Sequence, residues 1–200
     1  MADSNITKQA MGTAFKELLE DRPFEKISVS DICDRCNMNR KSFYYHFKDK
    51  YDLANWIFDS EFVELMRQHD LDVMNTECRF EERWRGLSVA CEYFYENRTF
   101  YRRILKVEGQ NSFASHFRAF MYPVLEHRVR DIVSGEEVPR MAMDFIVDGL
   151  ICAIERWLLG KNCVTAEEFT DSLKALVNLL ILGMKHRLEA EPDWVEKLYR

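Results

Sequence analysis

Residues that break helices are scarce in this sequence, because only 7 glycines and 4 prolines punctuate its 200 residues. No segment alternates apolar and polar residues for long enough to indicate a strand. Apolar residues instead recur at helical spacing, as do Met11, Ala14, Phe15 and Leu18 at positions i, i+3, i+4 and i+7. The chain is therefore predicted to be all-α.

The helical pattern divides the chain into nine segments. The first ends before Pro23, because a proline disfavours the helical conformation in the residue that precedes it. Later segments are bounded by capping motifs, such as the T-x-x-E box that begins at Thr165, and by glycines such as Gly160. The predicted helices span about 6–20, 29–36, 40–46, 50–68, 81–97, 99–106, 111–133, 139–159 and 166–188.

The composition indicates a globular protein whose N-terminal part contains a basic segment. Hydrophobic residues make up 47% of the chain, which is ample for a buried core. The formal net charge of -6 excludes a protein that coats nucleic acid with its whole surface, since neutralising phosphates requires excess Lys and Arg. Residues 22–50 differ, because seven basic and four acidic groups give this stretch a charge of +3.

The sequence also indicates where in the cell the protein is located. The N-terminal residues contain no apolar segment typical of a secretion signal. The longest apolar runs, such as 150–154, are far shorter than the roughly 18 residues of a membrane span. The six cysteines are spread through a long helical chain, which favours reduced thiols over disulfides. We expect a cytoplasmic protein with no membrane contact.

Two short helices, predicted at 29–36 and 40–46, have the dimensions of a helix-turn-helix. Ser28 begins an S-x-x-D capping box for the first of them. Asn37 tolerates the left-handed conformation that ends a helix, and Asn39 is a good N-cap for the second.

The second short helix begins with Arg40, Lys41 and Ser42. The first turn of a helix already favours an anion, because its free N–H groups and the positive end of the dipole lie there. A phosphate backbone suits this site. Phe43 and Phe47 lie four residues apart, on one face, and are expected in the core.

Three rings with polar tips, Tyr44, Tyr45 and His46, occupy the same two turns. Such rings can pack against a groove wall while the hydroxyl or N–H reaches a phosphate or a base edge. The alternative is a core cluster, which is the commoner role of aromatic residues at helical spacing. The local pattern leaves both open.

Residues 6–53 resemble the N-terminal domain of the tetracycline repressor (TetR) family of bacterial regulators, in the register FEKISVSDICDRCNMNRKSFYYHFKDKYDL. The positions on the family's pattern are Phe24, Ile32, Tyr44, His46, Phe47, Lys50 and Leu53. In that family the domain is a three-helix bundle whose third helix enters the major groove. The resemblance implies a DNA-binding domain over 1–50 and a larger helical regulatory and dimerisation domain over 51–200, joined by the helix at 50–68.

The resemblance also implies which residues contact DNA. Phosphate contacts are expected from Ser28, Ser42, Tyr44, His46 and Lys50. The candidates for contacting base edges are Arg40, Lys41 and Tyr45, arginine being the usual partner of guanine. We expect Lys50→Ala to weaken binding to all DNA and to flatten its salt dependence, whereas Arg40→Ala changes the preferred sequence.

The sequence departs from the family at the turn. Asn37 and Asn39 stand where the family usually has glycine and serine, and Cys33 and Cys36 stand where it has alanine. The C-x-x-C spacing suits zinc or redox chemistry, but no second pair with matching spacing accompanies it. We interpret both cysteines as small packing residues and expect no metal and no cofactor.

No enzyme is indicated. The sequence lacks metalloprotease, phosphate-loop, dinucleotide and serine-hydrolase motifs. Asp144, Asp148 and Glu155 lie in an apolar helix, where capping, ion pairing with Arg156 or inter-subunit contacts explain them better than acid–base catalysis.

The helices at 139–159 and 166–188 are apolar on more than one face. Two such helices from each of two subunits can form a four-helix bundle, which predicts a homodimer. The alternative is a monomer in which both helices lie centrally.

The middle of the chain is rich in rings, which either line a ligand pocket or form ordinary core. They are Tyr93, Phe94, Tyr95, Phe100, Tyr101, Phe113, Phe117, Phe120 and Tyr122. A looser similarity, in FKELLEDRPFEKISVSDIC and FYRRILKVEGQNSFASHF, is to TetR-like activators of dihydroxyacetone kinase operons. In those proteins a kinase-like partner loaded with dihydroxyacetone is the coactivator, so the resemblance implies either a small-molecule effector or a coactivator protein.

Together these features predict a homodimeric transcriptional regulator that binds a near-palindromic operator on double-stranded DNA. The alternative is a helical protein-interaction module that keeps the fold without DNA binding.

Overall fold

The computed structural model describes residues 2–69, 80–107, 112–132, 140–161 and 163–190. Within these ranges the chain forms α-helices and one 3₁₀ turn, and no strand. The all-α prediction is confirmed. The helices are α1 (Ala2–Asp21), α2 (Val29–Arg35), α3 (Arg40–His46), α4 (Lys50–Gln68), α5 (Phe80–Glu96), α6 (Arg98–Ile104), α7 (Phe113–Ile132), α8 (Arg140–Leu159) and α9 (Ala166–Ala190), with the 3₁₀ turn at Phe24–Lys26.

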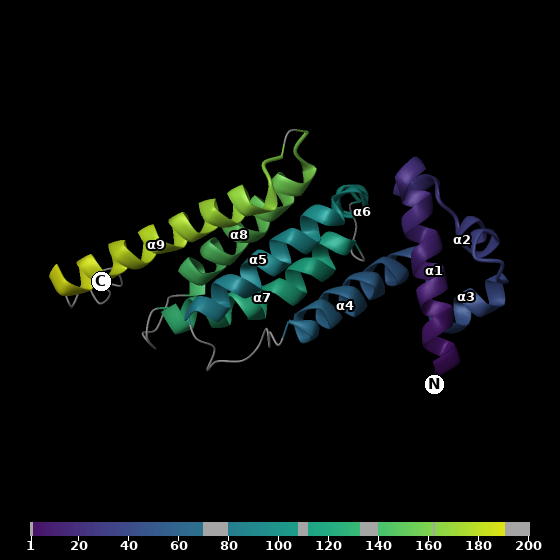
Figure 1. The fold of residues 1–200 in the computed structure, drawn as a ribbon, viewed down its shortest axis with the longest axis horizontal. Coiled ribbons are helices and arrows are strands. Elements are labelled where there is room, and N and C mark those ends of the chain that lie inside the picture. Colours follow the sequence, from purple (N-terminus) through teal and green to yellow (C-terminus); the bar gives the residue numbers. More distant parts are fainter. Residues whose placement is uncertain (1, 70–79, 108–111, 133–139, 162, 191–200) are drawn as a thin grey trace.

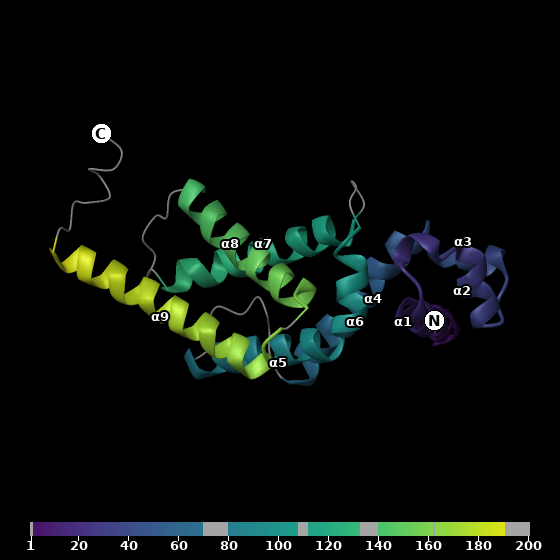
Figure 2. The same ribbon diagram turned by 90° about the horizontal axis from the view of Figure 1, so that it is seen from above.

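The helices form two groups joined by α4 (Figures 1 and 2). The N-terminal bundle, α1 to α3, lies at one end of an elongated molecule, and the C-terminal bundle, α5 to α9, lies at the other. In the C-terminal bundle α5 packs along α9 and α7 packs along α8. None of the described helices is long and apolar enough to cross a bilayer.

The core of the N-terminal bundle starts from one stripe of α1. Met11, Phe15 and Leu19, spaced four residues apart, are completely buried. Gly12 lies on the same helix where α1 meets α4: a Cβ at this position would lie 3.3 Å from a side-chain carbon of Ile57. The small residue therefore allows the two helices to approach closely.

Four of the rings noted in the middle of the chain, together with Phe62, pack around Phe58, which is fully buried. Their centroids lie 5.1–6.3 Å from that of Phe58, in stacked and edge-to-face arrangements typical of aromatic cores. These neighbours are Phe62, Phe94, Phe113, Phe117 and Phe120. For these rings, core packing is the alternative that the structure supports.

Candidate nucleic-acid interface

The second helix, α2, begins at the capping box predicted from the sequence. The Ser28 hydroxyl accepts a hydrogen bond from the backbone N–H of Asp31 at 3.2 Å, and the Asp31 carboxylate accepts one from the backbone N–H of Ser28 at 2.8 Å. The hydrogen bonds with Ser28 also hold the pKa of the Asp31 carboxyl below its usual value. Two backbone N–H groups at the N-terminal end of α2 thereby gain hydrogen-bond acceptors, which fixes where the helix starts.

Two asparagines shape the turn between α2 and α3. Asn37 has φ of 54°, in the left-handed region that asparagine tolerates better than most residues. The N–H of Met38 donates to the carbonyl of Cys33 at 2.9 Å, which closes the end of α2. The Asn39 side chain accepts from the N–H of Ser42 at 2.8 Å and caps α3. The predicted helix-turn-helix is present, with both asparagines in their expected roles.

The third helix has one buried and one exposed face. Phe43 and Phe47 are 0% and 3% exposed, as expected from their spacing, and their rings contact each other at 5.7 Å. Tyr44 and Tyr45 are 51% and 83% exposed. Exposure this large for tyrosine rings is unusual in a folded protein that has no partner for them. The core alternative is therefore wrong for these two tyrosines.

Cationic side chains lie on the same exposed face. Arg40 and Lys41 are exposed, and within the described part of the chain neither forms an ion pair. The Arg40 guanidinium lies 5.9 Å from the centre of the Tyr44 ring and donates to its hydroxyl at 3.4 Å. The cations of this face are thus available to neutralise phosphates or to donate to base edges.

Comparison with known sequences places both bundles in one family. The pattern of the family described as "Bacterial regulatory proteins, tetR family" matches residues 13–56. The TetR pattern described as "Transcriptional regulator C-terminal region" matches residues 82–179. Together they cover more than two thirds of the chain. The chain belongs to the TetR family of bacterial transcriptional regulators.

One curated relative aligns with almost the whole chain. It is the "HTH-type dhaKLM operon transcriptional activator DhaS" of Lactococcus lactis subsp. lactis, 26% identical over 195 residues that cover 92% of this chain and 94% of the relative. The sequence-based prediction of a DNA-binding transcriptional regulator is confirmed by the family, and the alternative without DNA binding is not favoured.

Solved structures share the fold. A "Dihydroxyacetone kinase operon activator DhaS" superposes with a TM-score of 0.61 at 22% identity, covering 88% of this chain and 96% of the other. A TetR regulator from Syntrophomonas wolfei superposes with a TM-score of 0.65 at 17% identity, covering 89% and 96%. The N-terminal helix-turn-helix followed by a larger helical domain is therefore the TetR arrangement.

Other predicted DNA contacts of this TetR-family regulator lie beside the exposed face of α3. Ser42 and His46 are partly buried, and the centroids of the His46 and Tyr45 rings lie 4.9 Å apart in an edge-to-face arrangement. Ser28 is exposed at the start of α2. Ser42 and His46 lie on α3 and Ser28 is the N-cap of α2, and their contacts with DNA stay predictions.

Lys50 has a further role that the sequence did not indicate. Its ammonium donates to the carbonyls of Phe24 and Ile27 at 2.8 Å each and to that of Glu25 at 3.4 Å. It also lies 4.5 Å from the centre of the Phe24 ring, and burial lowers the pKa of the amine. Lys50 therefore holds the 3₁₀ turn between α1 and α2, and its phosphate contact stays a prediction.

Cys33 of α2 and Cys36, the C-cap of that helix, pack in or against the core, as expected. Cys33 is 1% exposed, and burial raises the pKa of both the Cys33 and the Cys36 thiol. A protonated thiol is a poor ligand and a poor nucleophile. Cys36 contacts the carbonyl of Cys33 at 3.6 Å. Of the remaining cysteines, Cys78 lies outside the described residues.

The carboxylates of α8 form contacts within the C-terminal bundle. Asp144 accepts from the hydroxyl of Tyr122 and pairs with Arg140 at 3.1 Å. Asp148 pairs with Arg118 of α7, and not with the expected Arg156. These contacts explain two of the three acidic residues by ion pairing, one of the roles favoured over catalysis in the sequence analysis.

Replacing Lys50 by methionine tests its structural role without DNA. Methionine keeps most of the length of the side chain but removes the donors, so three carbonyls lose a charged partner. We expect the free energy of unfolding to fall by about 1–3 kcal/mol, measured by urea denaturation at a fixed protein concentration. Lys41→Met, at an exposed position, is the matched control and should change it by less than about 0.5 kcal/mol. Equal stability of the two variants would contradict this role.

Proposed function

We propose that this regulator binds a near-palindromic operator as a homodimer, with one α3 of each protomer in the major groove. The observation that carries the proposal is the division of α3 into two faces. Phe43 and Phe47 fix the helix to the bundle, while Tyr45 and the two cations of its first turn face outward. One face of α3 is thus anchored in the bundle, and the other face is exposed where DNA would bind.

The proposed contacts divide by chemistry. Hydroxyls, imidazole and ammonium suit phosphate oxygens, and we assign them to Ser28, Ser42, Tyr44, His46 and Lys50. A guanidinium can donate two hydrogen bonds to guanine, and the base-contacting set is Arg40, Lys41 and Tyr45. Residues 1–50 form the proposed DNA-binding domain and 51–200 the regulatory domain. Because the target is DNA, we place the protein in the bacterial cytoplasm.

The exposed apolar surface of α8 and α9 supports self-association. Met141 and Phe145 of α8 are 84% and 81% exposed, and Leu176 and Leu179 of α9 are 46% and 68% exposed. Gly149, further along α8, has no atom within 4 Å of the place that a Cβ would take. Four large apolar side chains this exposed on α8 and α9 are typical of a subunit interface. We assign this surface to the four-helix dimer contact; Pro139 and the side chains of 180–188 lie outside the described residues.

The controlling signal is proposed to be a coactivator protein. The relative DhaS is described as an activator of a dhaKLM operon, and its similarity extends over 92% of this chain, regulatory part included. The rings around Phe58 pack against one another, so the centre of the C-terminal bundle is occupied by side chains. The filled ring cluster favours a partner that acts from the surface over a ligand that enters the cluster.

Binding to DNA that flanks its own gene tests the proposed function directly. In mobility-shift assays we expect Arg40→Ala to lose discrimination at one or two base pairs of the bound site by about 1–3 kcal/mol. Lys50→Ala should weaken binding to every sequence alike and reduce the slope of log K against log salt by about one phosphate contact. Identical sequence preferences in Arg40→Ala and the wild type would contradict the base contact, and an unchanged slope would assign Lys50 to the fold alone.

The dimer surface is tested with Phe145→Asp. Burying a charge in an apolar interface is costly, so we expect the variant to run as a monomer in light scattering and to lose at least about tenfold in operator affinity. Val63→Asp is the matched control, because Val63 is 51% exposed and lies on α4, away from this surface. A Phe145→Asp variant that remains dimeric would contradict the assignment.

A further inference from the structure

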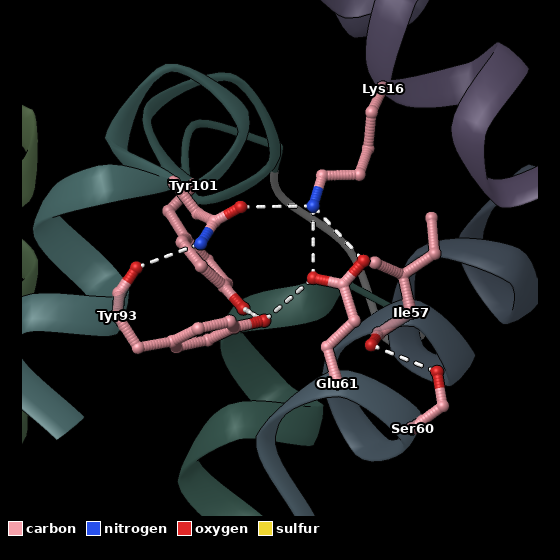
Figure 3. A network of polar contacts seen from close by, with 7 residues as sticks. Lys16, Ile57, Ser60, Glu61, Tyr93 and Tyr101 are labelled. Atoms are coloured by element: carbon pink, nitrogen blue, oxygen red, sulfur yellow. Dashed lines mark hydrogen bonds and ion pairs between the residues drawn. The ribbon is translucent and has the colours of Figure 1, made fainter. Parts of the chain in front are cut away.

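A cluster of polar side chains ties the N-terminal bundle to the C-terminal one (Figure 3). Its members are Lys16 of α1, Glu61 of α4, Tyr93 of α5, Asn97 between α5 and α6, and Tyr101 of α6. We call it the junction cluster. Its partners are up to 81 residues apart in the sequence, so it fixes elements that only the fold brings together.

The tyrosines form the buried end of the junction cluster. The Tyr101 hydroxyl donates to that of Tyr93 at 2.8 Å, and Tyr93 donates to a carboxylate oxygen of Glu61 at 3.0 Å. Tyr101 is 0% and Tyr93 8% exposed, and burial raises the pKa of both hydroxyls. Both hydroxyls therefore stay protonated. The hydrogen bonds form a chain from Tyr101 to Tyr93 to the Glu61 carboxylate, which is the final acceptor.

Lys16 closes the cluster from the side of α1. Its ammonium donates to the two carboxylate oxygens of Glu61 at 3.0 and 2.9 Å and to the side-chain oxygen of Asn97 at 2.9 Å. The amide of Asn97 in turn donates to the carbonyl of Tyr93 at 3.0 Å. The ammonium also lies 5.6 Å from the centre of the buried Phe100 ring. One cation of α1 is thus bound by groups from α4, from the residue between α5 and α6, and from α6.

The geometry of the cluster matters more than its strength. The side chains of Lys16 and Glu61 are 27% and 37% exposed, and ion pairs exposed to this degree contribute little to stability. Their hydrogen bonds nevertheless fix the angle between the N-terminal and the C-terminal bundle, because they hold α1 both to the adjacent α4 and to the C-terminal bundle. A second contact, between Asp59 of α4 and His116 of α7 at 2.7 Å, holds α4 itself against the C-terminal bundle.

We propose that Lys16 and Glu61 are positioning residues that set which half-site spacing the regulator accepts on DNA. The proposal rests on homodimeric operator binding. The proposed dimer surface lies on α8 and α9, and α3, with the proposed DNA contacts, lies at the opposite end of the molecule (Figure 1). The distance between the two α3 helices of a dimer then depends on the angle that the junction cluster fixes between the N-terminal and the C-terminal bundle of each protomer. The bases contacted within one half-site depend on α3 alone.

The experiment separates spacing from base recognition. An operator is first selected by the wild-type dimer from a random duplex library. A series of duplexes then keeps both half-sites and inserts or removes single base pairs at the centre, and affinities are measured at fixed salt. We expect the wild type to prefer one spacing, and Glu61→Gln to reduce its preference over the neighbouring spacings at least about tenfold. Both proteins should show the same ranking of base substitutions within a half-site.

Matched variants exclude a general loss of structure. Glu64→Gln removes the same charge one turn further along α4, where Glu64 accepts hydrogen bonds from Arg67 and Gln68 of the same helix, and should keep the wild-type spacing preference. Lys16→Met should relax the preference as Glu61→Gln does, and the double variant should add little, because both changes remove one contact. Lys16→Met also supplies the test if Glu61→Gln does not fold, as judged by circular dichroism.

Two results would overturn the proposal. In the first, folded Glu61→Gln and Lys16→Met variants keep the wild-type spacing preference. In the second, they lose affinity equally at all spacings, which would give the cluster a merely structural role. A wild-type protein that selects no DNA at all would contradict the proposed function itself, and so is distinguishable from either result.

Discussion

One helix, α4, supplies buried side chains to both bundles, and the arrangement of the whole molecule depends on this sharing. Its first turns belong to the N-terminal bundle, where Tyr51 contacts the Phe24 ring at 4.8 Å and Ile57 lies against Gly12. Its later turns belong to the C-terminal bundle, where Phe62 stacks on Phe94. Protein interiors are closely packed and hardly compressible. Movement of one bundle relative to the other therefore requires a change in how the α4 side chains pack.

The helix that we propose to face DNA, α3, depends on its packing in the N-terminal bundle. Seven residues are too few for a stable isolated helix in water, so α3 requires its Asn39 cap and the burial of Phe43 and Phe47. Tyr44 and Tyr45 lie outside the buried stripe that those two phenylalanines form, and both are exposed. The exposure of these rings and of the cations beside them is thus a consequence of how the short helix is anchored.

Local features of the fold could be predicted from the sequence because their causes are local. The caps at Ser28 and Asn39 and the four-residue spacing of the α3 phenylalanines each act within one turn, and the structure confirms all of them. Contacts between distant segments could not be predicted. Nothing in the sequence pairs Lys16 with Asn97, or indicates that the Lys50 ammonium is used by the backbone of 24–27. Arg156 was a reasonable partner for the α8 carboxylates by sequence distance, but the α7–α8 packing brings Arg118 to Asp148.

Hydrogen–deuterium exchange of the regulator, free and bound to its selected operator, tests the central claim most directly, since it maps the DNA-covered surface without any substitution. The account predicts that binding slows exchange mainly in the segment 28–50, at the amides of the capping box, the turn and the first turn of α3. Slowed exchange confined to the C-terminal bundle, with residues 28–50 unchanged, would contradict it.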